Sequence, residues 1–175
     1  TARESAGINK RILTVKDFRE AFSLCIDRTA FTTQFTAAAA PGYGLLNYMY
    51  HAILEDGSEA CYRNVPAAKQ ALVNLYGIEY GEGKEYATLA EAYKAVSGYD
   101  LDAAKALMQE AYLECKANGT YTDGQKISLD LIVTSRDSIS EAARKNATVL
   151  DAFLKEAIKG TGFEAGGIEL NPKNL

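Results

Sequence analysis

The sequence has few of the residues that build metal sites and disulfides. Its 175 residues include one histidine, His51, and three widely spaced cysteines, Cys25, Cys61 and Cys115, without a Cys-x-x-Cys pair. This set excludes the usual zinc-ligand patterns, so we predict no metal site and no cofactor. Cys25 and Cys115 lie among apolar residues at helical spacing and are expected to be buried, whereas Cys61 lies in a polar loop as a free thiol. We expect no structural disulfide.

Long apolar runs and basic stripes are also missing. No window approaches the roughly 18 consecutive apolar residues of a membrane-spanning helix. Acidic and basic residues are interspersed with a formal net charge of −4, so no nucleic-acid partner is expected. Hydrophobic residues make up 47% of the chain and charged residues 24%, which is the composition of a globular protein. We predict one monomeric domain over residues 1–175 around a single core.

The motifs of common enzyme sites are absent as well. The chain has no G-x-S-x-G segment and no pair of carboxylates in a glycine-framed loop. The stretch 81–84, Gly-Glu-Gly-Lys, lacks the following Ser or Thr of a phosphate-binding loop and is predicted to be a turn. Without a nucleophile beside a base, a hydrolase or transferase has no candidate site. We therefore predict that the chain is not an enzyme.

Helical patterns dominate the first two thirds of the chain. An amphipathic helix is predicted over residues 14–28, with Thr14 and Asp17 as a capping box. A second short helix follows over residues 29–35. The face predicted to be buried in the first helix consists of Phe18, Ala21, Phe22, Cys25 and Ile26.

Shorter helices are expected further along. Residues 66–75 begin with a proline and should bury Ala68, Leu72 and Leu75. Residues 88–96 begin with a second capping box. A longer helix should start after Asp100 as N-cap, with its buried face made of Leu101, Ala104, Leu107, Met108, Ala111 and Cys115.

The C-terminal third has the pattern of a βαβ unit. Strands are predicted over residues 127–134 and 163–170, joined by a helix that Ser138 caps, so the strands should be parallel with a right-handed crossover. Open α/β sheets bind ligands beyond the carboxyl ends of their strands, which makes Ser135 and Arg136 candidate ligand-binding residues. In the alternative interpretation this segment only caps the helix.

Three segments share a pattern with one known family. Residues 17–28 resemble its D-x-R-x-R-x-A-x-x-x-A-I-D-R, with Phe18 and Cys25 replacing its first arginine and its last alanine. Residues 99–111 are similar to its Y-D-P-E-K-A-K-A-L-L-A-E-A-G, and residues 154–170 keep the order of its L-x-x-x-L-G-I-x-V-E-L with an extra Gly-Thr-Gly. The chain thus resembles the extracytoplasmic solute-binding proteins of oligopeptide and dipeptide ABC importers, of the family 5 type.

The resemblance implies an α/β fold, the helix-rich lobe of a type II periplasmic-binding-protein-like structure. The chain corresponds to the first part of the second lobe, with a loop-rich insertion around residues 47–97. A downstream W-x-x-D-Y-x-D-P segment, which in the family supplies an acid for the peptide's α-ammonium, has no counterpart, since the chain has no tryptophan. We therefore expect an excised part of a longer protein that by itself binds peptides weakly or not at all.

A ligand-binding loop is also implied. Residues 41–44, Pro-Gly-Tyr-Gly, match the first half of the family's G-x-x-x-P-A-x-G-x-x-P-P loop, which borders the ligand cleft, and Leu45 stands near its paired prolines. The resemblance therefore implies that Tyr43, Gly44 and Leu45 contact the ligand. The tyrosines of this region would either stack on a ligand or cover the core beneath a long loop, and the sequence leaves both alternatives open.

The function implied is that of a substrate-binding component of an ABC importer, which captures peptides or similar small solutes outside the membrane. Its partners would be the solute and the importer's membrane subunits. Its full-length form would be periplasmic or lipid-anchored at the cell surface. An alternative is a ligand-sensing domain of a transcription regulator, since related lobes occur in such proteins. A hydrolase is the third alternative.

Overall fold

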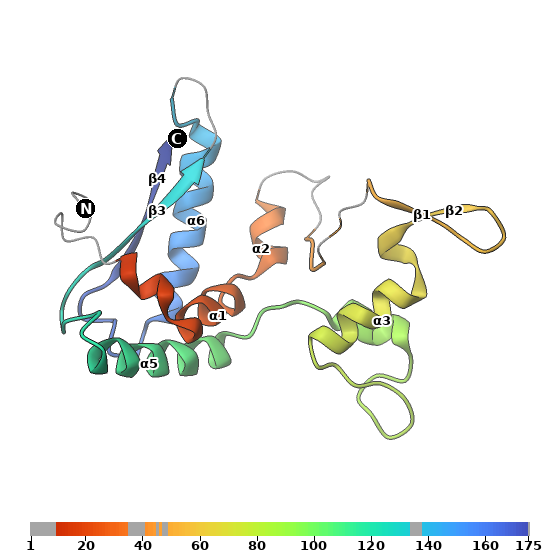
Figure 1. Cartoon of the computed structure of the whole chain (residues 1–175), viewed down its shortest axis with the longest axis horizontal. Coiled ribbons are helices and arrows are strands. Elements are labelled where there is room, and N and C mark those ends of the chain that lie inside the picture. The colour runs from red at the N-terminus through yellow and green to blue at the C-terminus, as the bar shows by residue number, and fades with distance from the viewer. Residues whose placement is uncertain (1–9, 35–40, 45, 47–48, 134–137, 175) are drawn as a thin grey trace. The chain divides into compact units, whose positions relative to one another are not determined.

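The chain is a mixed α/β protein with two compact units (Figure 1). Unit 1 combines residues 1–27 with 99–175, and unit 2 consists of residues 28–98. The computed structural model describes residues 10–34, 41–44, 46, 49–133 and 138–174. No helix within these ranges is both long and apolar enough to cross a lipid bilayer. The division into one domain with an insertion around residues 47–97 stays a prediction. All of residues 47–97 belong to unit 2.

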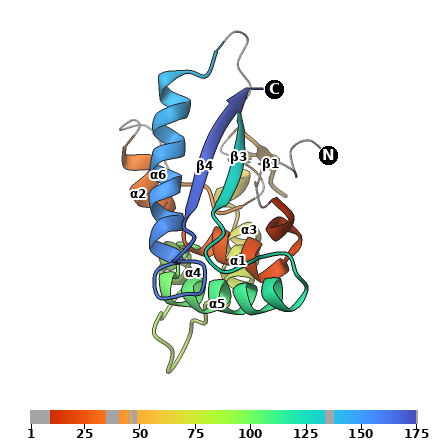
Figure 2. The same ribbon diagram turned by 90° about the vertical axis from the view of Figure 1, so that its left-hand side faces the viewer.

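Unit 1 is built around a βαβ unit, and Figure 2 shows its helix lying along the two strands. In chain order its elements are η1 (Lys10–Thr14), α1 (Lys16–Leu24), α5 (Leu101–Ala117), β3 (Ile127–Val133), α6 (Glu141–Ala157) and β4 (Ile168–Asn174).

The strands β3 and β4 are parallel, as predicted, and their register pairs Ile127 with Ile168. These two residues and Leu129 are buried with Leu154 of α6 in one core. The first three residues of β3 are buried, whereas Ile132 near its other end is 47% exposed. The first part of the strand, where apolar and polar residues alternate, is therefore its buried end, and the continuous apolar run over residues 131–133 lies at its more exposed end.

Two predicted boundaries in the βαβ unit are wrong. The N-cap of α6 is Ser140 rather than Ser138, and its side chain accepts a hydrogen bond from a backbone N–H of the first turn. The second strand begins at Ile168 rather than at Phe163. Phe163 lies in turns and is fully buried, with its ring centroid 4.9 Å from that of Tyr121 in an edge-to-face contact. Core packing of this aromatic side chain outweighs its strand propensity.

The predicted capping box at Thr14 is also wrong. Thr14 closes the short helix η1, where its hydroxyl donates a hydrogen bond to the carbonyl of Arg11 at 2.7 Å. The cap position of α1 falls on Val15, which has no side-chain capping bond. The Thr14 hydroxyl is thus bonded to a residue that precedes it and cannot also cap the first turn of α1. This local hydrogen bond replaces the predicted capping box.

The helix predicted over residues 14–28 is interrupted. Helix α1 ends at Leu24, whose carbonyl accepts a hydrogen bond from the backbone N–H of Asp100 at 3.0 Å instead of continuing the helical ladder. The predicted buried face is confirmed: Phe18, Ala21 and Cys25 are buried, and Phe22 and Ile26 pack partly buried against the same core.

The prediction for α5 is confirmed. The Asp100 carboxylate accepts a hydrogen bond from the backbone N–H of Ala103 at 2.9 Å, which satisfies one of the open donors of the first turn. The fully buried residues of this helix are Ala104, Met108, Ala111 and Cys115. With α1 and the sheet they enclose the core of unit 1.

Unit 2 consists of short elements. They are α2 (Arg28–Thr33), β1 (His51–Ile53), β2 (Glu59–Cys61), η2 (Tyr62–Asn64), α3 (Pro66–Leu75) and α4 (Leu89–Ala95). The helices expected at 29–35, 66–75 and 88–96 are all present within one to two residues, apart from residue 35, which lies outside the described residues. The capping box of Thr88 and Glu91 is confirmed.

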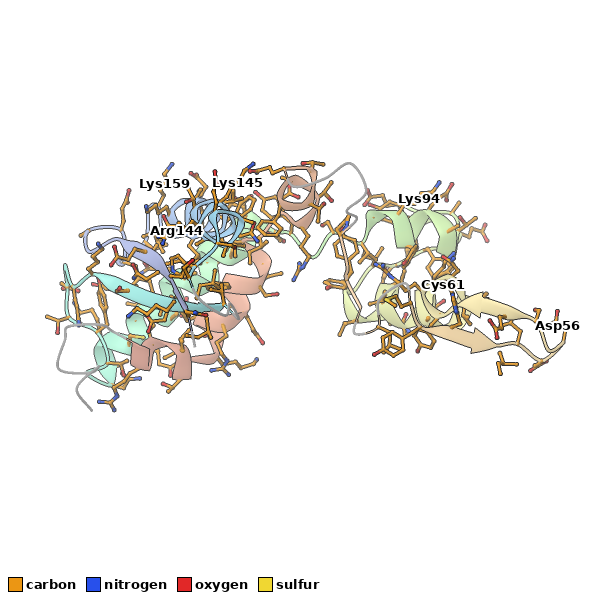
Figure 3. The ribbon with its side chains drawn as sticks, turned by 90° about the horizontal axis from the view of Figure 1, so that it is seen from above. Asp56, Cys61, Lys94, Arg144, Lys145 and Lys159 are labelled. Atoms are coloured by element: carbon orange, nitrogen blue, oxygen red, sulfur yellow. The ribbon has the colours of Figure 1, made fainter. Side chains whose placement is uncertain are left out.

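The sequence did not predict the hairpin formed by β1 and β2. These strands are antiparallel, with Ala52 opposite Ala60, and Asp56 lies at the tip of the hairpin (Figure 3). Its carboxylate accepts a hydrogen bond from the Ser58 backbone N–H at 2.9 Å, and Gly57 supplies the positive φ of 80°. Each strand has only three residues, too few to display the alternation by which a strand is recognised.

The core of unit 2 is small and rich in tyrosine. Its buried residues are Val73, Ala92 and Val96, against which the rings of several tyrosines pack. The prediction that Leu75 faces inward is wrong, because Leu75 is 73% exposed and Val73 is fully buried in its place. The partly buried residues around this cluster are Tyr43, Tyr76, Ile78, Tyr80, Tyr86, Leu89 and Tyr93.

Candidate functional site

The predicted ligand-binding residues fall in two places. Tyr43 and Gly44 belong to unit 2, whereas Leu45, Ser135 and Arg136 lie outside the described residues.

A pocket of about 250 Å³ opens beside this loop, within unit 2. Gly44 and Leu46 form its loop side, and α3 forms another wall. Its lining residues are Gly44, Leu46, Tyr62, Arg63, Ala68, Ala71 and Leu72. Gly44 is thus a predicted site residue that the structure places at a cavity.

The wall made by α3 follows from helical spacing. Ala68, Ala71 and Leu72 are three and four positions apart, so they share one helix face. Pro66 at the first helical position fixes the start of this helix. A Cβ atom at Gly44 would lie 3.4 Å from Cδ1 of Leu72, an ordinary van der Waals distance, so the loop backbone at Gly44 lies beside this face of α3.

Arg63 is the charged residue of the lining. It lies in η2, directly after the hairpin, and is half-buried. Its Nη2 donates a hydrogen bond to the carbonyl of Pro41 at 3.1 Å, which anchors one side of the guanidinium group to the loop. Among the described residues, no carboxylate forms an ion pair with Arg63. The pocket therefore combines apolar walls with one positioned cation.

Tyr43 contributes to packing beside the pocket. Its ring packs against the core cluster of unit 2, and its hydroxyl lies 3.2 Å from Oγ1 of Thr29. Its carbonyl accepts a hydrogen bond from the Tyr76 hydroxyl at 3.3 Å. This arrangement favours the alternative in which Tyr43 covers the core, and it holds the Gly44 backbone next to the pocket.

Polar and charged side chains form a network on one face of the β3–β4 sheet. The Ser128 hydroxyl donates to Oε1 of Glu169 at 2.9 Å, and the Asn171 amide donates to the Ser128 hydroxyl at 2.8 Å. Lys126 also pairs with Glu169, and these hydrogen bonds together lower the pKa of the Glu169 carboxyl. Lys173 lies 3.2 Å from Asp130, whose side chain is 5% exposed. This network joins the two strands, and its charged groups are matched within the protein.

Another cavity of about 440 Å³ lies near the end of α6. Lys126, Lys155 and Lys159 line it, which would suit an anion if these cations were available. Each of them pairs with a carboxylate instead, the partners being Glu169, Asp151 and Glu156 respectively. Compensation inside the protein removes the excess positive charge that an anion site needs.

The cysteines are not placed for nucleophilic chemistry. All three are free thiols, and Cys25 and Cys115 are buried as predicted. Burial raises the pKa of Cys25 to about 12 and that of Cys115 to about 11, so both remain protonated at neutral pH. Within the described part of the chain, no three or more His, Cys, Asp or Glu side chains are grouped to hold a metal ion.

Sequence reasoning missed Arg63 and Tyr62 because no motif surrounds them. A signal did exist in the helix face of α3, where two alanines and a leucine repeat at helical spacing next to a tyrosine-rich stretch. That face was interpreted as core alone. No family model, curated protein or solved structure matches the chain.

Proposed function

We propose that the chain belongs to the substrate-binding component of an ABC importer and contributes to capturing peptides or similar small solutes outside the membrane. The observation that carries the proposal is the pocket beside Gly44. It lies at the loop that resembles the cleft-bordering loop of the peptide-binding family, and its walls are apolar with one cation. Such a combination suits a ligand with an apolar side chain and few polar groups.

The packing of unit 1 supports the same proposal. The three segments that resemble the family lie mainly in α1, in α5 and between the end of α6 and β4. Residues of all three, including Phe18, Met108 and Leu154, pack in one core. Segments far apart in the sequence thus form a helix-covered βαβ lobe, and this arrangement supports the proposed type II periplasmic-binding-protein-like fold.

The proposal includes the partners and the location of the full-length protein. The solute would be delivered to the importer's membrane subunits, in the periplasm or at the outer surface of the cell. At about 250 Å³ the pocket is smaller than the about 300–1,000 Å³ of sites that enclose a drug-sized ligand. We therefore expect the isolated chain to bind peptides weakly, in the millimolar range.

Weak binding of this type is measurable by NMR. We would titrate a pool of random short peptides into isotope-labelled protein and follow the backbone amide signals. The expected result is concentration-dependent shifts at Gly44, Ala71 and Leu72. The variant Ala71→Phe fills the pocket from an exposed helix position and should abolish these shifts.

The matched control is Ala67→Phe, which adds the same ring at an exposed position of α3 outside the pocket lining. It should leave the titration unchanged. Shifts confined to unit 1, or no shifts at peptide concentrations in the tens of millimolar, would contradict the proposal. Release of cleaved peptides during the titration would favour a hydrolase instead.

A further inference from the structure

The charge distribution around the pocket selects among the possible solutes. Arg63 contributes a positive charge, and the remaining lining side chains are uncharged: Leu46, Tyr62, Ala68, Ala71 and Leu72, with Gly44 adding backbone only. A guanidinium group has five N–H donors in a rigid fork, and the hydrogen bond to Pro41 engages one side of it. The fork is therefore held in place before any ligand arrives.

We propose that the pocket selects ligands that carry a free carboxylate next to an apolar group, and that Arg63 binds the carboxylate. In a peptide this combination is the C-terminal residue with an apolar side chain. The inference rests on the proposed function, because it specifies the substrate class of the same pocket. A planar carboxylate can accept two parallel hydrogen bonds from one guanidinium group, which is the preferred geometry of this pair.

The apolar walls provide a second contact for the ligand. Ala68 is 8% exposed and forms an apolar face of α3 with Leu72 beside Gly44, whereas Ala71 and Tyr62 of the lining are exposed. The apolar group of the ligand would bury surface against Leu46 and Leu72 while its carboxylate binds Arg63. A ligand that carries both groups should therefore bind more tightly than a ligand with only one of them.

Other ligand classes fit the site less well. A cationic group would be repelled by Arg63, and a phosphate dianion, which can also accept two hydrogen bonds from a guanidinium group, would keep one negative charge uncompensated beside a single arginine. Lys69, also in α3, is not part of the pocket lining. Its Nζ lies 5.4 Å from the centroid of the Tyr93 ring, so its charge is directed to the tyrosine cluster and adds no second cation to the pocket. A single carboxylate is the anion that one arginine neutralises.

The test compares isocaproate with isocaproamide, which have the same apolar tail and differ in the charged group. The full chain is titrated with each compound by NMR. We expect isocaproate to bind about tenfold tighter or more, because hydrogen bonds to a charged group are lost with the amide. Arg63→Gln should remove this preference, and Arg63→Lys, which keeps the charge without the fork, should retain part of it.

Lys94→Gln is the matched control. Lys94 is an exposed cation of α4 in the same unit, outside the pocket lining, so its removal should leave the preference intact (Figure 3). Thermal unfolding of each variant checks that the loss of the Pro41 contact has not unfolded unit 2. If Arg63→Gln is unfolded, the preference for isocaproate is measured in Arg63→Lys instead. Ala71→Phe then shows whether the binding takes place in the pocket.

The outcomes separate this inference from the proposed function. Equal binding of isocaproate and isocaproamide, or a preference that persists in Arg63→Gln, overturns the carboxylate site. The peptide pool is then titrated in two forms, with free and with amidated C-termini. If both forms bind equally at Ala71 and Leu72, the pocket is a peptide site without carboxylate selection. If neither form binds, both proposals are wrong.

Discussion

The backbone N–H of Asp100 donates a hydrogen bond to the carbonyl of Leu24 at 3.0 Å, across 76 positions of the sequence. This bond ends α1 at the point where the chain enters α5, and the Asp100 side chain caps α5 in the same place. Asp100 therefore links the end of α1 to the start of α5. Both helices belong to unit 1, so the junction is part of its stability.

Replacing the cap at Asp100 should destabilise the protein. The variant Asp100→Ala leaves the Ala103 N–H without its acceptor, and we expect a loss of about 1 kcal/mol in the free energy of unfolding. Denaturant unfolding monitored by circular dichroism measures this. Asp100→Asn keeps a capping oxygen and should lie within about 0.5 kcal/mol of the wild type. Equal losses in both variants would show that the capping bond is not the cause.

Tyr121 should tolerate the loss of its hydroxyl. This oxygen is buried and has no hydrogen-bond partner among the described residues, and burial raises the pKa of the phenol. The variant Tyr121→Phe removes an unsatisfied polar group, so we expect a gain of about 1 kcal/mol in the free energy of unfolding. Tyr112→Phe is the contrasting variant, because the Tyr112 hydroxyl donates to Asp123 at 2.6 Å, and it should lower stability. A loss in Tyr121→Phe would contradict the expectation.

Acid should weaken the network around Glu169. Hydrogen bonds from Lys126 and Ser128 lower the pKa of this carboxyl below its value in the unfolded chain. The stabilisation is therefore complete above the unfolded-state pKa, about 4.3, and is lost as the pH falls through the lower folded-state pKa. The stability difference between wild type and Glu169→Gln should be constant near neutral pH and shrink below about pH 4. Unfolding curves at a series of pH values test this, and a difference that grows with acid would disprove it.

The three thiols should differ in reactivity. Cys61 is partly exposed, whereas Cys25 and Cys115 are buried and their pKa values are raised to about 12 and about 11. Iodoacetamide at neutral pH should therefore alkylate Cys61 first, and mass spectrometry of the digested protein locates the label. In denaturant all three should react at similar rates. Early labelling of Cys25 in the native protein would mean that the core of unit 1 opens easily.

Local sequence signals predicted most elements of the fold. Asp100 and the pair of Thr88 and Glu91 cap their helices as expected, since the capping bonds form between residues three positions apart. The buried face of α5 follows its 3.6-residue period. Two predictions failed because of contacts with distant parts of the chain: the Asp100 N–H ends α1, and aromatic neighbours hold Phe163 in the core instead of in a strand. The capping box at Thr14 failed for a local reason, since its hydroxyl donates to the carbonyl of Arg11.

For the candidate site, the sequence alone determined that Gly44 follows the turn signal of Pro41 and Gly42 and that Ala68 and Leu72 share a helix face. These properties depend on spacing and on residue type. Only the tertiary structure decided that the loop lies against this face, that Tyr43 turns to the core and that Arg63 is anchored at Pro41, 22 positions away. Contacts between residues so far apart in the sequence depend on the tertiary packing of the chain. The spacing of residues along the sequence does not determine that packing.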